Sequence, residues 1–193
     1  TDEFKPILQD HLDILARHLL NLKSFSLEII SESEIDFFRM FHEFQAIKIL
    51  KFSVPGSILS TSKARIYSLI HLKKLVLECN RIEEKVLWNL SKFMPNLKYL
   101  DISTKLGSSF DYLSELEHLS EITVHVSNEY YSMKIEEIFL LLDECPKLNK
   151  INLKFKFDIT FGLIRKLSKF AKSKPKQTIR FGFIPKENQD MIS

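Results

Sequence analysis

The hydrophobic residues of this chain recur in a short pattern, in which two residues separate a first apolar residue from a second and one residue separates the second from a third. The clearest copy is Leu72, Leu75 and Leu77, which Cys79 and Asn80 follow. Side chains two residues apart lie on the same side of a β-strand, so the last part of each copy predicts a strand with one buried face. Six full copies and a seventh, degraded one occur: Leu22/Phe25/Leu27, Phe44/Ile47/Ile49, Leu72/Leu75/Leu77, Leu97/Leu100/Ile102, Leu119/Ile122/Val124, Leu148/Ile151/Leu153 and Lys176/Ile179/Phe181.

Between the copies, the spacing of apolar residues changes from that of a strand to that of a helix. Residues 83–94 carry one apolar stripe, made of Val86, Leu87, Leu90, Phe93 and Met94. Comparable stripes lie in residues 5–20, 35–41, 135–142 and 163–170. A strand–helix unit with one apolar face cannot bury that face alone, so successive units must stack on one another.

Such stacking predicts a particular α/β fold. Successive copies begin 22 to 29 residues apart, which leaves room for a strand, a helix and their connections. Because connections between parallel strands are right-handed, the helices must lie on one side of the sheet. We therefore expect a right-handed solenoid, a horseshoe arc of about seven irregular repeats, with a parallel β-sheet on the concave face and α-helices on the convex face.

Length and composition suit a single domain of this kind. The 193 residues are 45% hydrophobic and 27% charged, and no apolar run is long enough to span a membrane, so no membrane partner is expected. We expect one domain over residues 1–185, in which a helix at about 5–20 caps the first strand and a degenerate repeat at about 160–184 comes last. Residues 186–193 then form a polar tail.

The chain lacks the common sequence signatures of catalysis. Its four glycines are at least 20 residues apart, which excludes a phosphate-binding loop, a dinucleotide fingerprint and a nucleophile elbow. A zinc-protease helix could begin at His42, but Ala46 stands where the second histidine is required. Cys79 and Cys145 are expected to be small buried hydrophobes, with a disulfide between them left open, and Trp88 is expected in the core. We therefore expect a non-catalytic intracellular protein, cytoplasmic or nuclear, with no metal and no cofactor.

Two phrases join a helix to the strand that follows it, MPNLKYLDI at residues 94–102 and CPKLNKINL at residues 145–153. Together with the strand pattern, they resemble the leucine-rich-repeat family, in particular its intracellular, ribonuclease-inhibitor-like branch and the C-P-x-L-x-x-L-x-L phrase of F-box/leucine-rich-repeat proteins. The resemblance covers about residues 5–185. It is incomplete, because only Asn80 stands where that family has an asparagine at the end of each strand.

The resemblance implies a protein–protein interaction module, the substrate-recognition part of an F-box ubiquitin-ligase receptor. No F-box-like helical segment is visible ahead of the repeats, so a Skp-type adaptor would bind through a segment outside this chain. The main alternative is a nucleic-acid- or chromatin-associated leucine-rich-repeat domain. A scaffold for a separate catalytic domain and a receptor ectodomain are further alternatives.

The residues between the buried strand positions are the candidate binding residues, because they face the concave side. We call the choice of buried positions in a copy its phase. In the second copy, Phe44/Ile47/Ile49, this phase places Ala46, Lys48 and Leu50 on the concave side. The candidates are Leu50, Lys74, Val76, Glu78, Tyr99, Asp101, Glu121, Thr123, His125, Lys150, Asn152, Lys154 and Arg180. Acidic residues occur in the central strands and basic residues in the last two, which would orient a partner with an acidic end. The competing interpretation is the mixed polar surface of any solvated sheet.

A basic region near the C-terminus is the second candidate surface. Residues 161–193 contain eight basic and two acidic residues, a net charge of +6, whereas residues 1–160 carry −3. The candidate basic patch consists of Arg165, Lys166, Lys169, Lys172, Lys174 and Lys176. These side chains either complement the dipole at the end of a last helix or bind an acidic protein surface or phosphates. The nucleic-acid alternative depends on the second interpretation.

Overall fold

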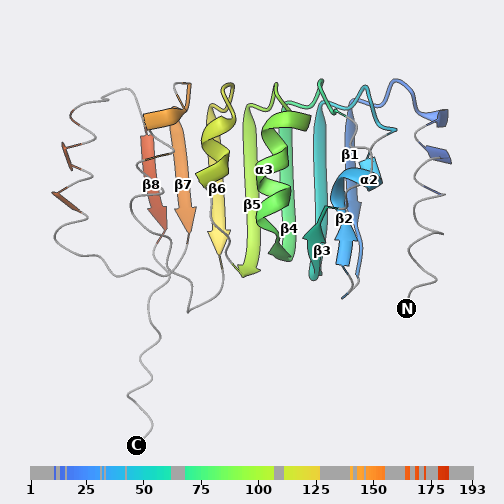
Figure 1. Ribbon diagram of the computed structural model, residues 1–193, viewed down its shortest axis with the longest axis horizontal. Helices are drawn as coiled ribbons and strands as arrows, with labels where there is room; N and C mark the ends of the chain where they lie inside the picture. The colour runs from blue at the N-terminus through green and yellow to red at the C-terminus, as the bar shows by residue number, and fades with distance from the viewer. Residues whose placement is uncertain are drawn as a thin grey trace, which may run out of the picture.

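Alternating apolar residues build one eight-stranded β-sheet in the described part of the computed structural model (Figure 1). The strands are β1 (Ser24–Glu28), β2 (Glu34–Asp36), β3 (Ile49–Ser60), β4 (Lys74–Ile82), β5 (Tyr99–Leu106), β6 (Glu121–Val126), β7 (Lys150–Lys154) and β8 (Thr178–Gly182). The structure describes residues 11, 14–15, 17–30, 32, 34–41, 43–61, 68–106, 111–126, 140, 143–145, 147–154, 164–165, 168–169, 172 and 178–182.

The strands are arranged in the order in which they occur along the chain. The sheet runs β1-β3-β4-β5-β6-β7-β8, and β2 pairs with the far end of β3, where Glu34 lies opposite Ile58. Every pair of neighbouring strands is parallel. Parallel neighbours cannot be joined by a tight hairpin, so the chain must cross back over one face of the sheet between strands. The predicted α/β class and parallel sheet are confirmed.

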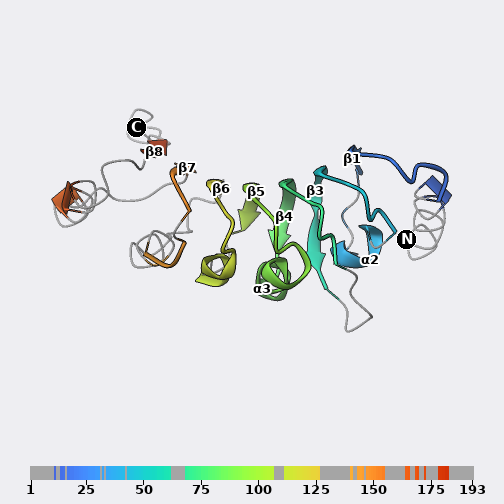
Figure 2. The ribbon, with the colours of Figure 1, turned by 90° about the horizontal axis from the view of Figure 1, so that it is seen from above.

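Helices are fewer than the sequence suggested within the described residues. They are α2 (Phe37–Phe41), α3 (Glu84–Phe93) and the 3-10 helix η1 (Asp111–Glu115). Figure 2 shows all three on the same side of the sheet. None of the described helices has the length and apolar character needed to cross a bilayer.

The helix predictions are confirmed in part. In α3, Val86, Leu87 and Leu90 are fully buried, as their stripe predicted. Over residues 35–41 the prediction was partly wrong, because Ile35 belongs to β2 and α2 has only five residues. The helices expected in residues 5–20, 135–142 and 163–170 fall largely outside the described residues.

Two ladders of apolar side chains form the buried face of the sheet. The first is Phe25–Leu50–Leu75–Leu100–Ile122–Ile151, and the second is Leu27–Phe52–Leu77–Ile102–Val124–Leu153. From Leu50 to Leu153 each of these side chains is at most 2% exposed. Burial of a whole leucine contributes about 2 kcal/mol, so the ladders supply much of the driving force for folding.

The sequence phase proposed for the second copy was wrong. Leu50 is fully buried and pairs with Leu75, so the second copy is Ile47/Leu50/Phe52 rather than Phe44/Ile47/Ile49. Phe44 is not part of the strand pattern. Its ring instead stacks on the ring of Phe25, with 4.9 Å between the ring centroids. In the corrected phase, the first four copies begin at regular intervals of 25 residues.

Candidate functional site

The face of the sheet opposite α3 carries the candidate binding residues. Figure 2 shows the strands along a shallow arc whose open side points away from α3, and we call this surface the open face. The strands β1, β3, β4, β5, β6 and β7 each contribute three alternate residues that are partly or fully exposed. The open face consists of Ser24, Ser26, Glu28, Ile49, Lys51, Ser53, Lys74, Val76, Glu78, Tyr99, Asp101, Ser103, Glu121, Thr123, His125, Lys150, Asn152, Lys154, Thr178 and Arg180.

Twelve of the thirteen predicted binding residues therefore lie together on this face. Leu50 is the error, because it lies in the core with none of its surface exposed. Its strand instead presents Ile49, Lys51 and Ser53, which the sequence interpretation missed. The regular interval of 25 residues is the signal that would have identified them.

Apolar side chains occur on β3, β4 and β5 of the open face. Tyr99 is 44% exposed, and the strand register places it beside Lys74, which in turn lies beside Ile49. Val76 lies two residues after Lys74 on the same face of β4 and is half-buried. Large, partly exposed side chains surrounded by charged residues are typical of the centre of a protein interface.

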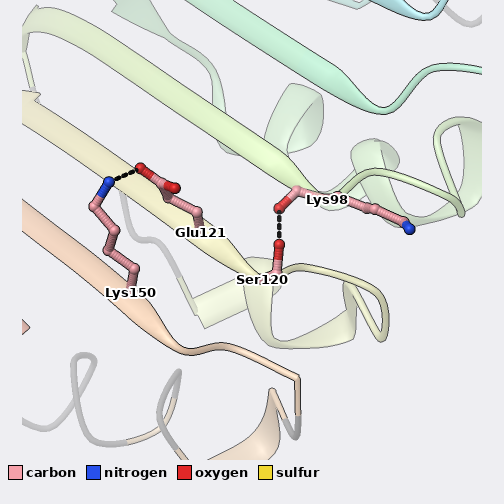
Figure 3. A network of polar contacts seen from close by, with 4 residues as sticks. All are labelled: Lys98, Ser120, Glu121 and Lys150. Carbon is pink, nitrogen blue, oxygen red and sulfur yellow. Dashed lines mark hydrogen bonds and ion pairs between the residues drawn. The ribbon is translucent and has the colours of Figure 1, made fainter. Parts of the chain in front are cut away.

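One ion pair joins two strands of the open face. Lys150 on β7 donates from Nζ to Oε1 of Glu121 on β6, its partner in the strand register (Figure 3). Both side chains are partly solvated, so this pair contributes at most about 1 kcal/mol. Its main effect is to neutralise the charges of Glu121 and Lys150, which the sequence pattern assigned to an acidic region and a separate basic region of the face.

Hydroxyl groups connect other strands across the same face. The Ser53 hydroxyl donates to Oε2 of Glu78 at 2.9 Å, and the Ser103 hydroxyl lies 3.4 Å from Nδ1 of His125. These contacts order the polar side chains between β3 and β4 and between β5 and β6.

Asp101 lies at the centre of this polar surface. Partial burial raises the pKa of its carboxyl above the usual value, and Glu121 acts in the same direction. Lys74 and Lys154 oppose the increase by favouring the ionised form. The raised pKa shows that the folded protein holds this negative charge less well than water does.

Neither cysteine is placed as a nucleophile. Cys79 and Cys145 are both buried and form no disulfide with each other, which confirms the predicted burial. Burial raises the pKa of the Cys79 thiol to about 12, although its hydrogen bond with Thr104 acts in the opposite direction. Within the described ranges, no three His, Cys, Asp or Glu side chains gather closely enough to hold a metal ion.

Trp88 is not in the core, contrary to the sequence prediction. Its side chain is 43% exposed on α3, and Nζ of Lys92 lies 3.6 Å from the ring centroid. Trp88 follows Leu87 by one residue, a rotation of about 100° around the helix, which carries it away from the buried stripe. The tryptophan therefore belongs to the side of the molecule opposite the open face.

The basic C-terminal patch is only partly described. Arg165, Lys169 and Lys172 are exposed. Lys166, Lys174 and Lys176 lie outside the described residues.

A row of lysines at one edge of the sheet escaped the sequence interpretation. Lys23, Lys48, Lys73 and Lys98 occupy the residue just before the first residue of β1, β3, β4 and β5, and all four are exposed. They recur at the interval of 25 residues that the wrong phase of the second copy concealed. We call these four residues the lysine row.

Comparison with known proteins adds no relative to this picture. No family model matches the chain, and no curated protein matches it at a significant level. The function is therefore inferred from the open face and its edges.

Proposed function

We propose that this chain is a leucine-rich-repeat arc that binds another protein on its open face. The observation that carries the proposal is the half-exposed Tyr99 on β5, the middle strand of a broad polar surface, with α2, α3 and η1 all on the opposite side. Partly exposed apolar side chains within a charged rim are what a protein partner would bury. The parallel strands, arranged in chain order with a buried apolar ladder, support the repeat assignment.

We further propose that the bound protein is a substrate of a ubiquitin ligase, and that the chain is the recognition part of an F-box receptor. The support is the helix-to-strand phrase at residues 94–102 and 145–153. Met94, Leu97 and Cys145 are fully buried at these junctions, as a structural motif requires. The proposal requires a Skp-binding segment outside the 193 residues.

Site-specific crosslinking tests which face binds the partner. A photo-crosslinking amino acid replaces either Val76 on the open face or Lys85, which is exposed on α3, in the full-length protein in cells. We expect a discrete adduct from the Val76 position that is lost when Tyr99→Ala is added, and no such adduct from Lys85. Equal adducts from both positions would overturn the open face as the binding surface.

The F-box assignment has its own test. The full-length protein should co-purify with a Skp adaptor, and depletion of the adaptor should slow the degradation of the protein crosslinked at Val76. Failure of both results would reject the ligase role and leave the interaction role intact. Binding of mixed DNA and RNA that weakens steeply with salt, and that is lost on neutralising Lys166, Lys169, Lys172 and Lys174, would favour the nucleic-acid alternative instead.

A further inference from the structure

The four members of the lysine row are direct neighbours in space. The backbone N–H of Lys48 donates to the carbonyl of Lys23 at 2.8 Å, that of Lys73 to Lys48 at 2.8 Å, and that of Lys98 to Lys73 at 2.9 Å. Adjacent strands lie about 4.8 Å apart, so the row extends over about 14 Å along the N-terminal edge of the sheet. Figure 3 shows the side chain of Lys98 extending beyond the N-terminal end of β5, on the side away from Glu121.

The lysine row ends at Lys98, because the equivalent residues before β6 and β7 are not lysines. The next residue in the same ladder is Ser120, whose hydroxyl donates to the carbonyl of Lys98 at 3.0 Å (Figure 3), and Asn149 follows it. The positive charge is thus confined to the half of the sheet from β1 to β5.

The row does not contribute to folding through ion pairs within the described chain. None of its four ammonium groups forms a salt bridge with a described acidic residue, in contrast to Lys150 with Glu121. Like charges on directly opposed strand positions repel one another, so four stacked lysines oppose the folded state. An external polyanion would remove this repulsion and bind more tightly for the same reason.

Exposed aliphatic residues accompany the charges. Leu20 is 71% exposed and Ile70 is 44% exposed, and each precedes a lysine of the row by three residues. A ligand that covers this edge would therefore meet both ammonium groups and apolar side chains. A peptide can supply both kinds of contact, because carboxylates and aliphatic groups alternate easily along it, whereas a phosphate polymer offers no aliphatic side chains.

The scarcity of aromatic residues on the open face also favours a peptide over a nucleic acid. Proteins that bind single-stranded nucleic acid usually combine a cationic track with several aromatic side chains on which bases stack. Among the described open-face residues, Tyr99 is the only phenylalanine, tyrosine or tryptophan, and it directly follows Lys98 of the row. Side chains on one face of an extended peptide repeat every 6.6 Å or so, which means that about three carboxylates fit along the row.

We propose that Lys23, Lys48, Lys73 and Lys98 bind an extended acidic segment of a protein partner, whose aliphatic residues contact Leu20 and Ile70. This inference rests on the proposed interaction function and specifies the chemistry of one part of the bound protein. The carboxylates lie along the N-terminal edge of the sheet, and the remainder of the partner covers the open face.

Peptide binding to the full chain tests the proposal. The probe is a fluorescein-labelled decapeptide in which glutamate alternates with leucine or serine, and the control probe has glutamine in place of each glutamate. We expect the acidic probe to bind at low salt and weaken steeply as salt is added, while the control probe does not bind. The variant Lys48→Gln with Lys73→Gln should weaken binding of the acidic probe at least tenfold.

A matched variant separates the row from general surface charge. Lys85→Gln with Lys105→Gln removes the same net charge from exposed lysines on α3 and at the far end of β5, and should change the affinity less than twofold. The row variant should melt at the same or a higher temperature than the parent chain, because it relieves repulsion. A row variant that stays folded and binds the acidic probe as tightly as the parent would overturn the proposal.

Two further outcomes identify where an error lies. If the row variant binds normally but crosslinking from Val76 still depends on Tyr99, then the lysine row is rejected and the interaction function stands. If an oligouridine strand competes with the acidic probe on equal terms and loses affinity in the row variant, the partner is a nucleic acid and the peptide assignment is wrong.

Discussion

Ile49 and Leu50 are adjacent in β3, yet Leu50 is fully buried whereas Ile49 is partly exposed on the open face. The same contrast holds along whole ladders. The ladder through Leu50 is apolar in every strand, whereas the ladder through Ile49 continues as Lys74, Tyr99, Glu121 and Lys150. The buried face must repeat one chemistry because each side chain packs on its equivalents. The open face can change at every strand, so specificity for a partner can develop there.

The largest expected effect tests this contrast at the two adjacent residues of β3. Leu50→Ala removes a fully buried side chain between Phe25 and Leu75 and should reduce the free energy of unfolding by about 2–5 kcal/mol. Ile49→Ala should cost less than about 1 kcal/mol, since its side chain is already partly in water. Urea denaturation followed by circular dichroism measures both values. Equal losses for the two variants would contradict the corrected phase.

A smaller effect is expected from two hydroxyl groups that are adjacent in β5. Thr104 is buried, and its Oγ1 donates to the carbonyl of Asn80 at 2.9 Å. Thr104→Val leaves that acceptor without this partner and should reduce the unfolding free energy by about 1–3 kcal/mol. Ser103→Ala, on the open face, should change it by less than about 0.5 kcal/mol. The comparison fails if the two substitutions have equal effects in the same urea titration.

The smallest effect is a gain in stability at Asp101. Its pKa is higher in the folded chain, so ionisation is less favourable there than in the unfolded chain, and stability falls as pH rises through that pKa. Asp101→Asn should therefore raise the melting temperature slightly at pH 7, equivalent to less than about 1 kcal/mol. The gain should shrink below about pH 4, where the carboxyl is protonated in both states.

Glu28→Gln is the matched control, because it removes an exposed carboxylate at the edge of the same face. Its effect should be smaller than that of Asp101→Asn at pH 7. Thermal melts of both variants across the acid range provide the measurement. A loss of stability in Asp101→Asn at neutral pH would show that attraction to Lys74 outweighs the cost of burial.

Much of the fold was predictable because burial imposes a repeated pattern. Leu75, Leu77, Leu100 and Ile102 were expected to be internal from alternation alone, and all four are buried. The same reasoning placed Val76 and Tyr99 on the exposed side, since residues one apart in a strand point in opposite directions. The placement of the candidate residues on the open face followed from the same alternation, and it holds in every strand where the phase was right.

The spacing of apolar residues by itself determined that parallel strands stack with one buried face. The tertiary structure decided the phase of the second copy, because Phe44, Ile47 and Leu50 are all apolar and two overlapping patterns fit the residues of that copy taken alone; only the 25-residue interval from its neighbours favours one of them. Backbone pairing with Leu75 placed Leu50 inside, while Phe44 packs beside Phe25 in the connection before β3. The lysine row was visible only afterwards, since hydrogen bonding between strands makes neighbours of residues that are 25 positions apart in the chain.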